Sequence, residues 1–210
     1  MADLGPTLLH AGLNLDAEPL EEREHTESGI FGFWAFLMSD AVVFALLFAI
    51  YGTMLRATAG GPGPAQEFDI GSTIVETLLL LTSSFTFGLA SLSMKFVRRR
   101  SSVALWLVVT LMLGLGFLGM EAHDFAKMVS DGATAQRSGF LSSYFVLVGM
   151  HGMHVTSGCI WICVMLVQLL MFGLDRRVKL NILRLGLFWH FLDIVWVCIF
   201  SIVYLQGLIG

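Results

Sequence analysis

Five long apolar runs constrain this chain more than any other feature of its sequence. Helices of about 20 residues, rising 1.5 Å per residue, cross a hydrocarbon core of roughly 30 Å. Each run exceeds that length, and breaks rich in charge or in Gly and Pro separate them. The sequence therefore predicts an all-α integral membrane protein, a five-helix transmembrane bundle. The runs cover residues 30–55, 70–97, 103–128, 140–172 and 182–208.

A soluble fold does not suit the composition. The chain is 56% hydrophobic and 13% charged, so too few charged residues remain to coat a globule whose core contains all five runs. The sequence shows no alternation typical of a β-barrel and no internal repeat. The domain expected from these observations is one transmembrane unit spanning residues 30–210.

Residues 1–29 precede the first run and are strongly acidic. They hold seven Asp and Glu residues and a single basic residue, Arg23. A secretory signal needs a basic start followed by an apolar core, which this segment lacks. We expect an acidic, mobile cytoplasmic tail. The net charge of −4 belongs to this tail, and no basic patch suggests a nucleic-acid partner.

Lysine and arginine are distributed unevenly between the two ends of the expected bundle. Nine fall on the side of the N-terminus, in the tail and in the breaks after the second and fourth runs; three fall on the other side. The positive-inside rule then predicts a cytoplasmic N-terminus, and five crossings put the C-terminus in the periplasm.

Ionisable residues within the apolar runs are the most informative side chains. An acid at the bilayer centre costs a few kcal/mol, so each should face protein or water and find a partner or a proton. None of the runs has a central Lys or Arg to pair with them. We expect these groups to form a buried polar structural network, whose members are Asp40, Glu76, Glu121, His123, His151, His154, His190 and Asp193.

The segment GMHGMHVTSG, residues 149–158, raises the sharpest chemical question. His151 and His154 are three residues apart and share one face of a helix. Three interpretations remain open from the residues alone: a proton or ion pathway, a metal or haem site, and a structural role. Cys159 and Cys163 are spaced for a shared metal, but no second pair of soft ligands accompanies them.

Signature blocks in all five runs resemble subunit III of haem–copper oxidases. The similarity extends from about residue 30 to the C-terminus. The blocks are IFGFWAFLMSD at 30–40, VETLLLLTSS at 75–84, FLGMEAHDF at 117–125, RSGFLSSYFVLVGMHGMHVTSG at 137–158 and WHFLDIVWVCIFSIVYL at 189–205. Room for five helices and the block GTMLRATAGGP, residues 52–62, are similar to the form found in bacterial cytochrome bo-type ubiquinol oxidases. Five-helix accessory proteins of nitric oxide reductases and cytochrome c oxidases are the nearest alternatives.

The resemblance implies an accessory subunit of a proton-pumping terminal oxidase in the bacterial inner membrane. Haem b, haem o and copper are then expected in subunit I, ubiquinol is the substrate of the complex, and subunits II and IV complete it. The resemblance implies direct contact with subunit I, and phospholipid is a further candidate ligand. No catalytic, cofactor-binding or metal residue is expected in this chain. The positions that match the family's intramembrane acid and histidine motifs are Glu76, His151, His154, His190 and Asp193.

Overall fold

The computed structural model describes residues 20–58, 70–96 and 99–205, with the backbone alone for residues 20–28. Within these residues the chain is helical, without strands, and five helices are long and apolar enough to cross a membrane. The helices are α1 (Leu20–Met54), α3 (Ile70–Phe96), α4 (Arg100–Ser130), α5 (Gly139–Phe172) and α6 (Arg176–Ile199), which continues as the π-helical turn η2 (Phe200–Leu205). The all-helical, five-span prediction is confirmed for this part of the chain.

The helix ends extend beyond the apolar runs at three places. α1 begins at Leu20 although its apolar span begins at Gly29, and α4 and α6 begin at Arg100 and Arg176, before the expected Val103 and Ile182. The added turns are polar or basic. They can remain helical because a helix satisfies its own backbone hydrogen bonds beyond the hydrocarbon as well as within it. Residues 1–19 of the expected tail, residue 97 and residues 206–208 lie outside the described residues.

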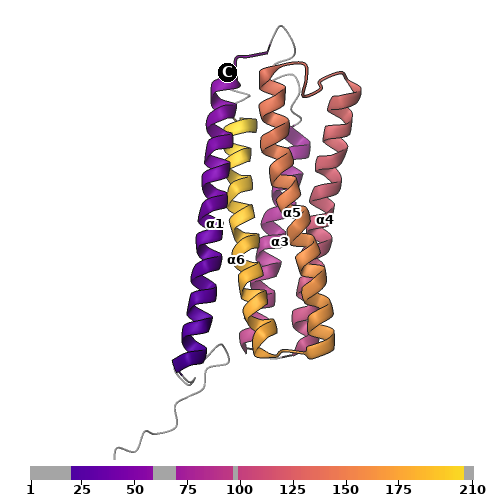
Figure 1. Ribbon diagram of the computed structural model, residues 1–210. Coiled ribbons are helices and arrows are strands. Elements are labelled where there is room, and N and C mark those ends of the chain that lie inside the picture. Colours follow the sequence, from indigo (N-terminus) through magenta and orange to yellow (C-terminus); the bar gives the residue numbers. More distant parts are fainter. Residues whose placement is uncertain (1–19, 59–69, 97–98, 206–210) are drawn as a thin grey trace, which may run out of the picture.

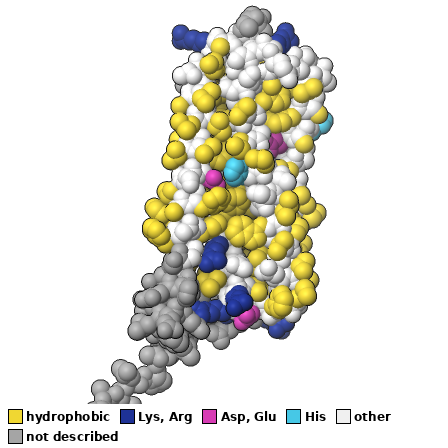
Figure 2. All heavy atoms as spheres, viewed as in Figure 1, with side chains coloured by type: hydrophobic (Ala, Val, Ile, Leu, Met, Phe, Trp, Pro, Cys, Tyr) yellow, Lys and Arg dark blue, Asp and Glu magenta, His cyan; other side chains and the backbone are white. Residues whose placement is uncertain are grey.

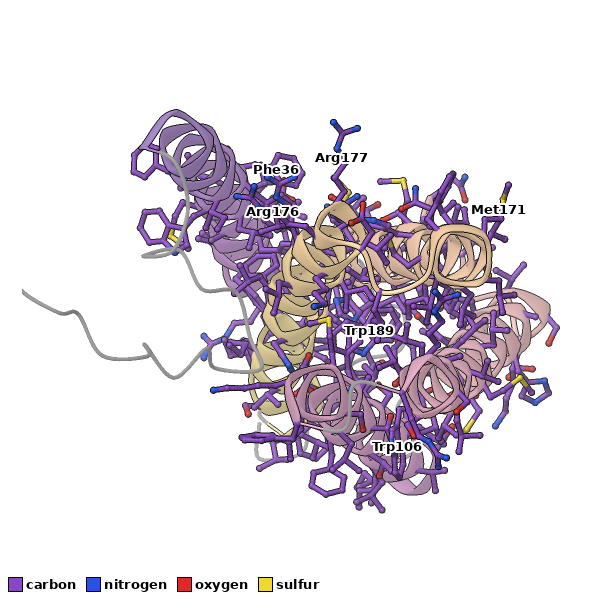
Figure 3. All side chains as sticks on the ribbon, turned by 90° about the horizontal axis from the view of Figure 1, so that it is seen from below. Phe36, Trp106, Met171, Arg176, Arg177 and Trp189 are labelled. Carbon is purple, nitrogen blue, oxygen red and sulfur yellow. The ribbon has the colours of Figure 1, made fainter. Side chains whose placement is uncertain are left out.

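Four helices form the core of the molecule, and the fifth lies at its edge. Figure 1 shows α3, α4, α5 and α6 side by side as a bundle, with α1 beside α5 and α6. Seen from below in Figure 3, Trp189 of α6 lies in the middle of the four-helix bundle, and α1 lies apart from α3 and α4. A membrane protein gains little from hiding apolar surface, so close packing of side chains must hold this bundle together.

Short connections close the bundle at its ends. Ser138 caps α5, because its hydroxyl oxygen accepts a hydrogen bond from the backbone N–H of Leu141 at 3.1 Å. At the opposite end of α5, Gly173 has a φ of 74°, in the left-handed region, and a Cβ there would collide with the guanidinium of Arg100. Glycine therefore allows the tight turn from α5 into α6.

Candidate functional site

The eight candidate polar residues divide by burial into three groups. Glu76 of α3, Glu121 of α4 and His151 of α5 are buried, with exposed fractions of 2%, 6% and 0%. Asp40 of α1, His154 of α5 and Asp193 of α6 are half-buried. The remaining two, His123 and His190, are exposed.

The described part of the chain therefore does not by itself enclose His123 or His190, and their place in the network stays a prediction. His123 lies two residues from Glu121, about 200° around the helix, so the inward position of Glu121 turns His123 outward. His190 follows Trp189, and the burial of Trp189 in the bundle puts the next side chain, about 100° around the helix, on the outer flank. Membership of an apolar run did not reveal which face each residue takes.

The carboxyl group of Glu121 packs against Gly152 in the GMHGMH segment. A Cβ at Gly152 would lie 2.9 Å from Oε1 of Glu121 and 3.0 Å from Oε2. Real Cβ atoms do not approach oxygen so closely, so the absence of a side chain at Gly152 makes room for this carboxyl. One function of the second glycine in the segment is therefore to let α4 bring an acid close to α5.

His151 lies inside a box of aromatic rings. Its imidazole centroid is 5.3 Å from that of Trp196, 5.9 Å from that of Phe117 and 6.4 Å from that of Phe44. Neither ring nitrogen has a hydrogen-bond partner within the described part of the chain. His151 thus contacts its neighbours through the faces and edges of its ring.

His154 is held differently, between its own helix and α1. Its Nδ1 lies 2.7 Å from the carbonyl oxygen of Met150 and must donate that hydrogen bond, because a carbonyl only accepts. Its Nε2 lies 3.7 Å from Oδ2 of Asp40, within ion-pair range but beyond hydrogen-bond length. Figure 2 shows an acidic side chain beside a histidine about half-way along the face on which α1 and α5 lie.

The carboxyl groups of Glu76 and Glu121 are not hydrogen-bonded to each other. Oε1 of Glu76 and both carboxyl oxygens of Glu121 lack a hydrogen-bond partner among the residues that the structure describes. They are nevertheless inside protein and away from the lipid-facing surface. Glu76 and Glu121 are thus both buried in the bundle, but no hydrogen bond joins them.

Hydroxyl groups and indoles make the interhelical hydrogen bonds instead. The indole N–H of Trp189 donates to Oγ of Ser83 at 3.1 Å, and that of Trp196 donates to Oγ1 of Thr77 at 3.1 Å, so two hydrogen bonds join α6 to α3. Further side-chain hydrogen bonds between elements include Thr86–Thr110, Ser84–His190, Ser72–Asp124 and Tyr144–Tyr204, at 2.7–2.9 Å. We did not predict Thr77, Thr86, Thr110, Tyr144 or Tyr204, although the hydroxyls that recur along α3 were a usable signal.

The donor set does not suit a metal ion. Within the described ranges no three His, Cys, Asp or Glu side chains are grouped so that they could hold one. Both ring nitrogens of His151 lie among aromatic rings, and Nδ1 of His154 is engaged with the backbone. Cys159 is buried whereas Cys163 is exposed, so the two thiols do not face one point.

Comparison with known proteins accounts for nearly the whole chain. The family described as cytochrome c oxidase subunit III matches residues 22–208. The chain is 45% identical to the cytochrome bo(3) ubiquinol oxidase subunit 3 of Pseudomonas aeruginosa, over 89% of this chain and 90% of that protein. It is 42% identical to the quinol oxidase subunit 3 of Bacillus subtilis, over 96% and 98% of the two chains. A cytochrome c oxidase subunit 3 from a Bacillus species, strain PS3, is 38% identical over 96% and 100%.

Proposed function

The chain belongs to the cytochrome c oxidase subunit III family, and we propose on that basis that it is the accessory subunit III of a terminal ubiquinol oxidase. One observation supports this most strongly: the ubiquinol oxidase subunit 3 of Pseudomonas aeruginosa and the quinol oxidase subunit 3 of Bacillus subtilis match at 45% and 42% identity across at least 89% of the chain. The chain is thus part of an oxidoreductase complex, and we propose that it is not catalytic by itself.

The proposed role is mechanical support of the catalytic subunit. The resemblance to haem–copper oxidases puts haem b, haem o and copper in subunit I, with ubiquinol as substrate of the complex and subunits II and IV as further partners. This chain would stabilise subunit I during assembly and turnover. A bundle joined by indole and hydroxyl bonds between α3, α4 and α6 suits that role, because such bonds fix the positions of helices that lipid alone would leave free.

We further propose an orientation in the bacterial inner membrane. The connections from α3 to α4 and from α5 to α6 lie at the end of the bundle where α1 begins, and most of the chain's 12 Lys and Arg residues lie in these connections or in the helix turns next to them. Figure 2 shows Lys and Arg side chains at both ends of the visible face, with a larger group at that end. By the positive-inside rule that end faces the cytoplasm, and the C-terminus faces the periplasm.

Cysteine labelling tests the orientation. We expect a cysteine placed at Thr134, in the connection from α4 to α5, to react with a membrane-impermeant maleimide in intact cells. A cysteine placed at Asp175, in the connection from α5 to α6, should react only after the cells are opened. The reverse pattern would invert the proposed topology. The experiment is run in a chain whose three native cysteines are replaced by serine.

Copurification tests the function itself. We expect the affinity-tagged chain, expressed at its natural level and extracted in mild detergent, to bring with it a protein that contains haem and copper and oxidises ubiquinol. A chain that purifies without any haem protein, while remaining folded and monodisperse, would refute the proposal.

A second candidate donor follows from one of the relatives. The cytochrome c oxidase subunit 3 of Bacillus strain PS3 is 38% identical to this chain, so membership of the family does not by itself determine the electron donor of the complex. The copurified complex is therefore assayed with reduced ubiquinol and with reduced cytochrome c. We expect oxygen consumption with ubiquinol and none with cytochrome c.

A further inference from the structure

One face of α6 carries a regular stripe of exposed side chains. Their spacing alternates between four and three residues, the pattern by which one helix packs along another in a left-handed coil. The stripe consists of Leu183, Leu187, His190, Ile194 and Val197 of α6, and it ends at Ser201 of η2. We call this set the outer stripe of α6.

The outer stripe is not used by packing within the chain. α6 buries other positions in the bundle, among them Trp189, Leu192 and Trp196. The four aliphatic members of the outer stripe remain 38–64% exposed. The helix therefore has a second packing face that the described part of the chain leaves uncovered.

His190 distinguishes this face from the other exposed faces of the bundle. It lies midway along the membrane span Arg176–Leu205. Its Nδ1 is 2.7 Å from Oγ of Ser84 on α3, and Asp193 lies one turn away on α6 and close to the same hydroxyl. For the other ring nitrogen, Nε2, no partner is found among the described residues. An ionisable ring facing hydrocarbon at this depth is costly, and lipid tails offer it no hydrogen bond.

Three other exposed polar side chains, two on α5 and one on α4, do not need an outside partner. Thr156 and Ser157 of α5 donate to the backbone carbonyls of Gly152 and His154. His123 lies in the last turns of α4, where a polar side chain can reach the interface with water. His190 lies between the aliphatic members of the stripe at the centre of the span. Its Nε2 therefore has no backbone carbonyl to bond among the described residues, and the ring is too far from the membrane surface to reach water.

We propose that one transmembrane helix from another subunit of the oxidase complex packs along the outer stripe of α6, and that this helix presents a hydrogen-bonding side chain to His190. The aliphatic members of the stripe provide the packing seam, and His190 sets the register of the two helices, as single polar residues do in coiled coils. The inference rests on the proposed function, since it requires a multisubunit complex.

Photo-crosslinking in the intact complex tests the proposal directly. A benzophenone amino acid is placed at Ile194, in the centre of the stripe, and at Val164, an exposed aliphatic position of α5, as the matched control. We expect Ile194 to crosslink to a different polypeptide of the purified complex and Val164 to crosslink to lipid. Crosslinking of Ile194 to lipid alone, or to a second copy of this chain, would overturn the proposal.

Substitution of His190 tests the polar contact. His190→Ala should lower the fraction of the chain retained on the tagged complex after detergent washing by about three- to tenfold, the range expected for one interhelical hydrogen bond in a membrane. His190→Gln should largely restore retention, and His123→Ala, the control, should not alter it. Equal retention of His190→Ala and the unchanged chain would count against the contact.

Two controls separate the possible failures. If His190→Ala does not accumulate in the membrane, the crosslinking result from the chain with His190 intact decides the question. If the unchanged chain does not copurify with a haem protein, the proposed function fails. If it copurifies but Ile194 labels only lipid, the function stands and this inference alone is refuted.

Discussion

Trp189 shows how single residues determine the packing of this bundle. Its six-membered ring lies between two glycines: a Cβ at Gly114 of α4 would be 2.9 Å from Cη2, and a Cβ at Gly158 of α5 would be 2.9 Å from Cζ3. The two glycines allow α4 and α5 to close on a large ring that lies at the centre of the molecule (Figure 3). Gly158 is the last residue of the GMHGMHVTSG segment, which thus contributes shape as well as polar groups.

Adding a methyl group beside this ring should destabilise the protein. We expect Gly158→Ala to lower the free energy of unfolding by about 1–3 kcal/mol, because the indole is confined on both sides and cannot move away. The control is Gly119→Ala on α4, where nothing lies within 4 Å of the added Cβ and alanine favours the helix. Thermal unfolding of the detergent-solubilised chain measures both. Equal melting temperatures for the two variants would contradict the packing described.

The hydrogen bond from Trp189 to Ser83 should contribute measurably to stability. A double-mutant cycle of Trp189→Phe and Ser83→Ala is expected to give a coupling free energy of about 0.6–2 kcal/mol, typical of hydrogen bonds between membrane helices. Trp106 is half-buried on α4, and the indole that donates to Ser83 is that of Trp189, so Trp106→Phe with Ser83→Ala provides the control cycle, for which we expect no coupling. A zero coupling for both cycles would remove this bond from the account.

His151 offers a test of the metal interpretation. Since neither of its ring nitrogens has a hydrogen-bond partner among the described residues, replacing it by an apolar side chain of similar size should be neutral or slightly stabilising. We expect His151→Leu to change the free energy of unfolding by less than about 1 kcal/mol. Loss of a bound metal from the chain, or destabilisation by several kcal/mol, would show that the imidazole holds a ligand or a water.

At the scale of helices, α1 is attached less firmly than the others. In residues 29–54, where its side chains are described, the buried ones are Leu37, Phe44 and Tyr51, spaced seven residues apart on one narrow stripe. In the most apolar 18-residue stretch of each membrane span, 11% is buried in α1, compared with 28–44% in the four other helices. Local stability should follow this difference, with α1 opening before the four-helix bundle.

Phe44 is the central contact of α1. Its ring centroid lies 5.3 Å from that of His154 and 6.4 Å from that of Phe191, so it touches both α5 and α6. We expect Phe44→Ala to accelerate amide hydrogen exchange throughout the apolar span of α1 and to leave α3 to α6 unchanged. Leu46→Ala, at a position 60% exposed, is the control and should not alter exchange. Accelerated exchange in all five helices would show that α1 is integral to the core.

The helices themselves were predictable from sequence, whereas the partners of polar groups were not. Apolar length located all five spans, because a bilayer imposes that length on any crossing helix. The polar turns at the starts of α1, α4 and α6 were missed, since hydropathy does not report helix beyond the membrane. Which face His123, His190 and the α3 hydroxyls occupy depends on how neighbouring helices rotate, and spacing along one helix contains no such information. That the acids and histidines form a structural network therefore remains a prediction.

At the scale of the whole molecule, the function proposed above requires a rigid support that holds no redox centre. Its interior is filled by aliphatic side chains and aromatic rings, and several of its polar links join helices to one another. Much of its outer surface is apolar, as a subunit embedded in lipid and in contact with other subunits requires (Figure 2). Catalysis in the complex should therefore not depend on any group of this chain, whereas durability of the complex should.

The most direct test compares the purified oxidase with and without this chain during continuous turnover. We expect the complex that lacks the chain to reduce oxygen at first with an unchanged rate per haem. It should then lose activity faster than the complete complex. Restoring the chain should restore durability. A complex that lacks the chain, contains all its haems and copper, and shows no initial activity would contradict the account, because the chain would then supply a catalytic group.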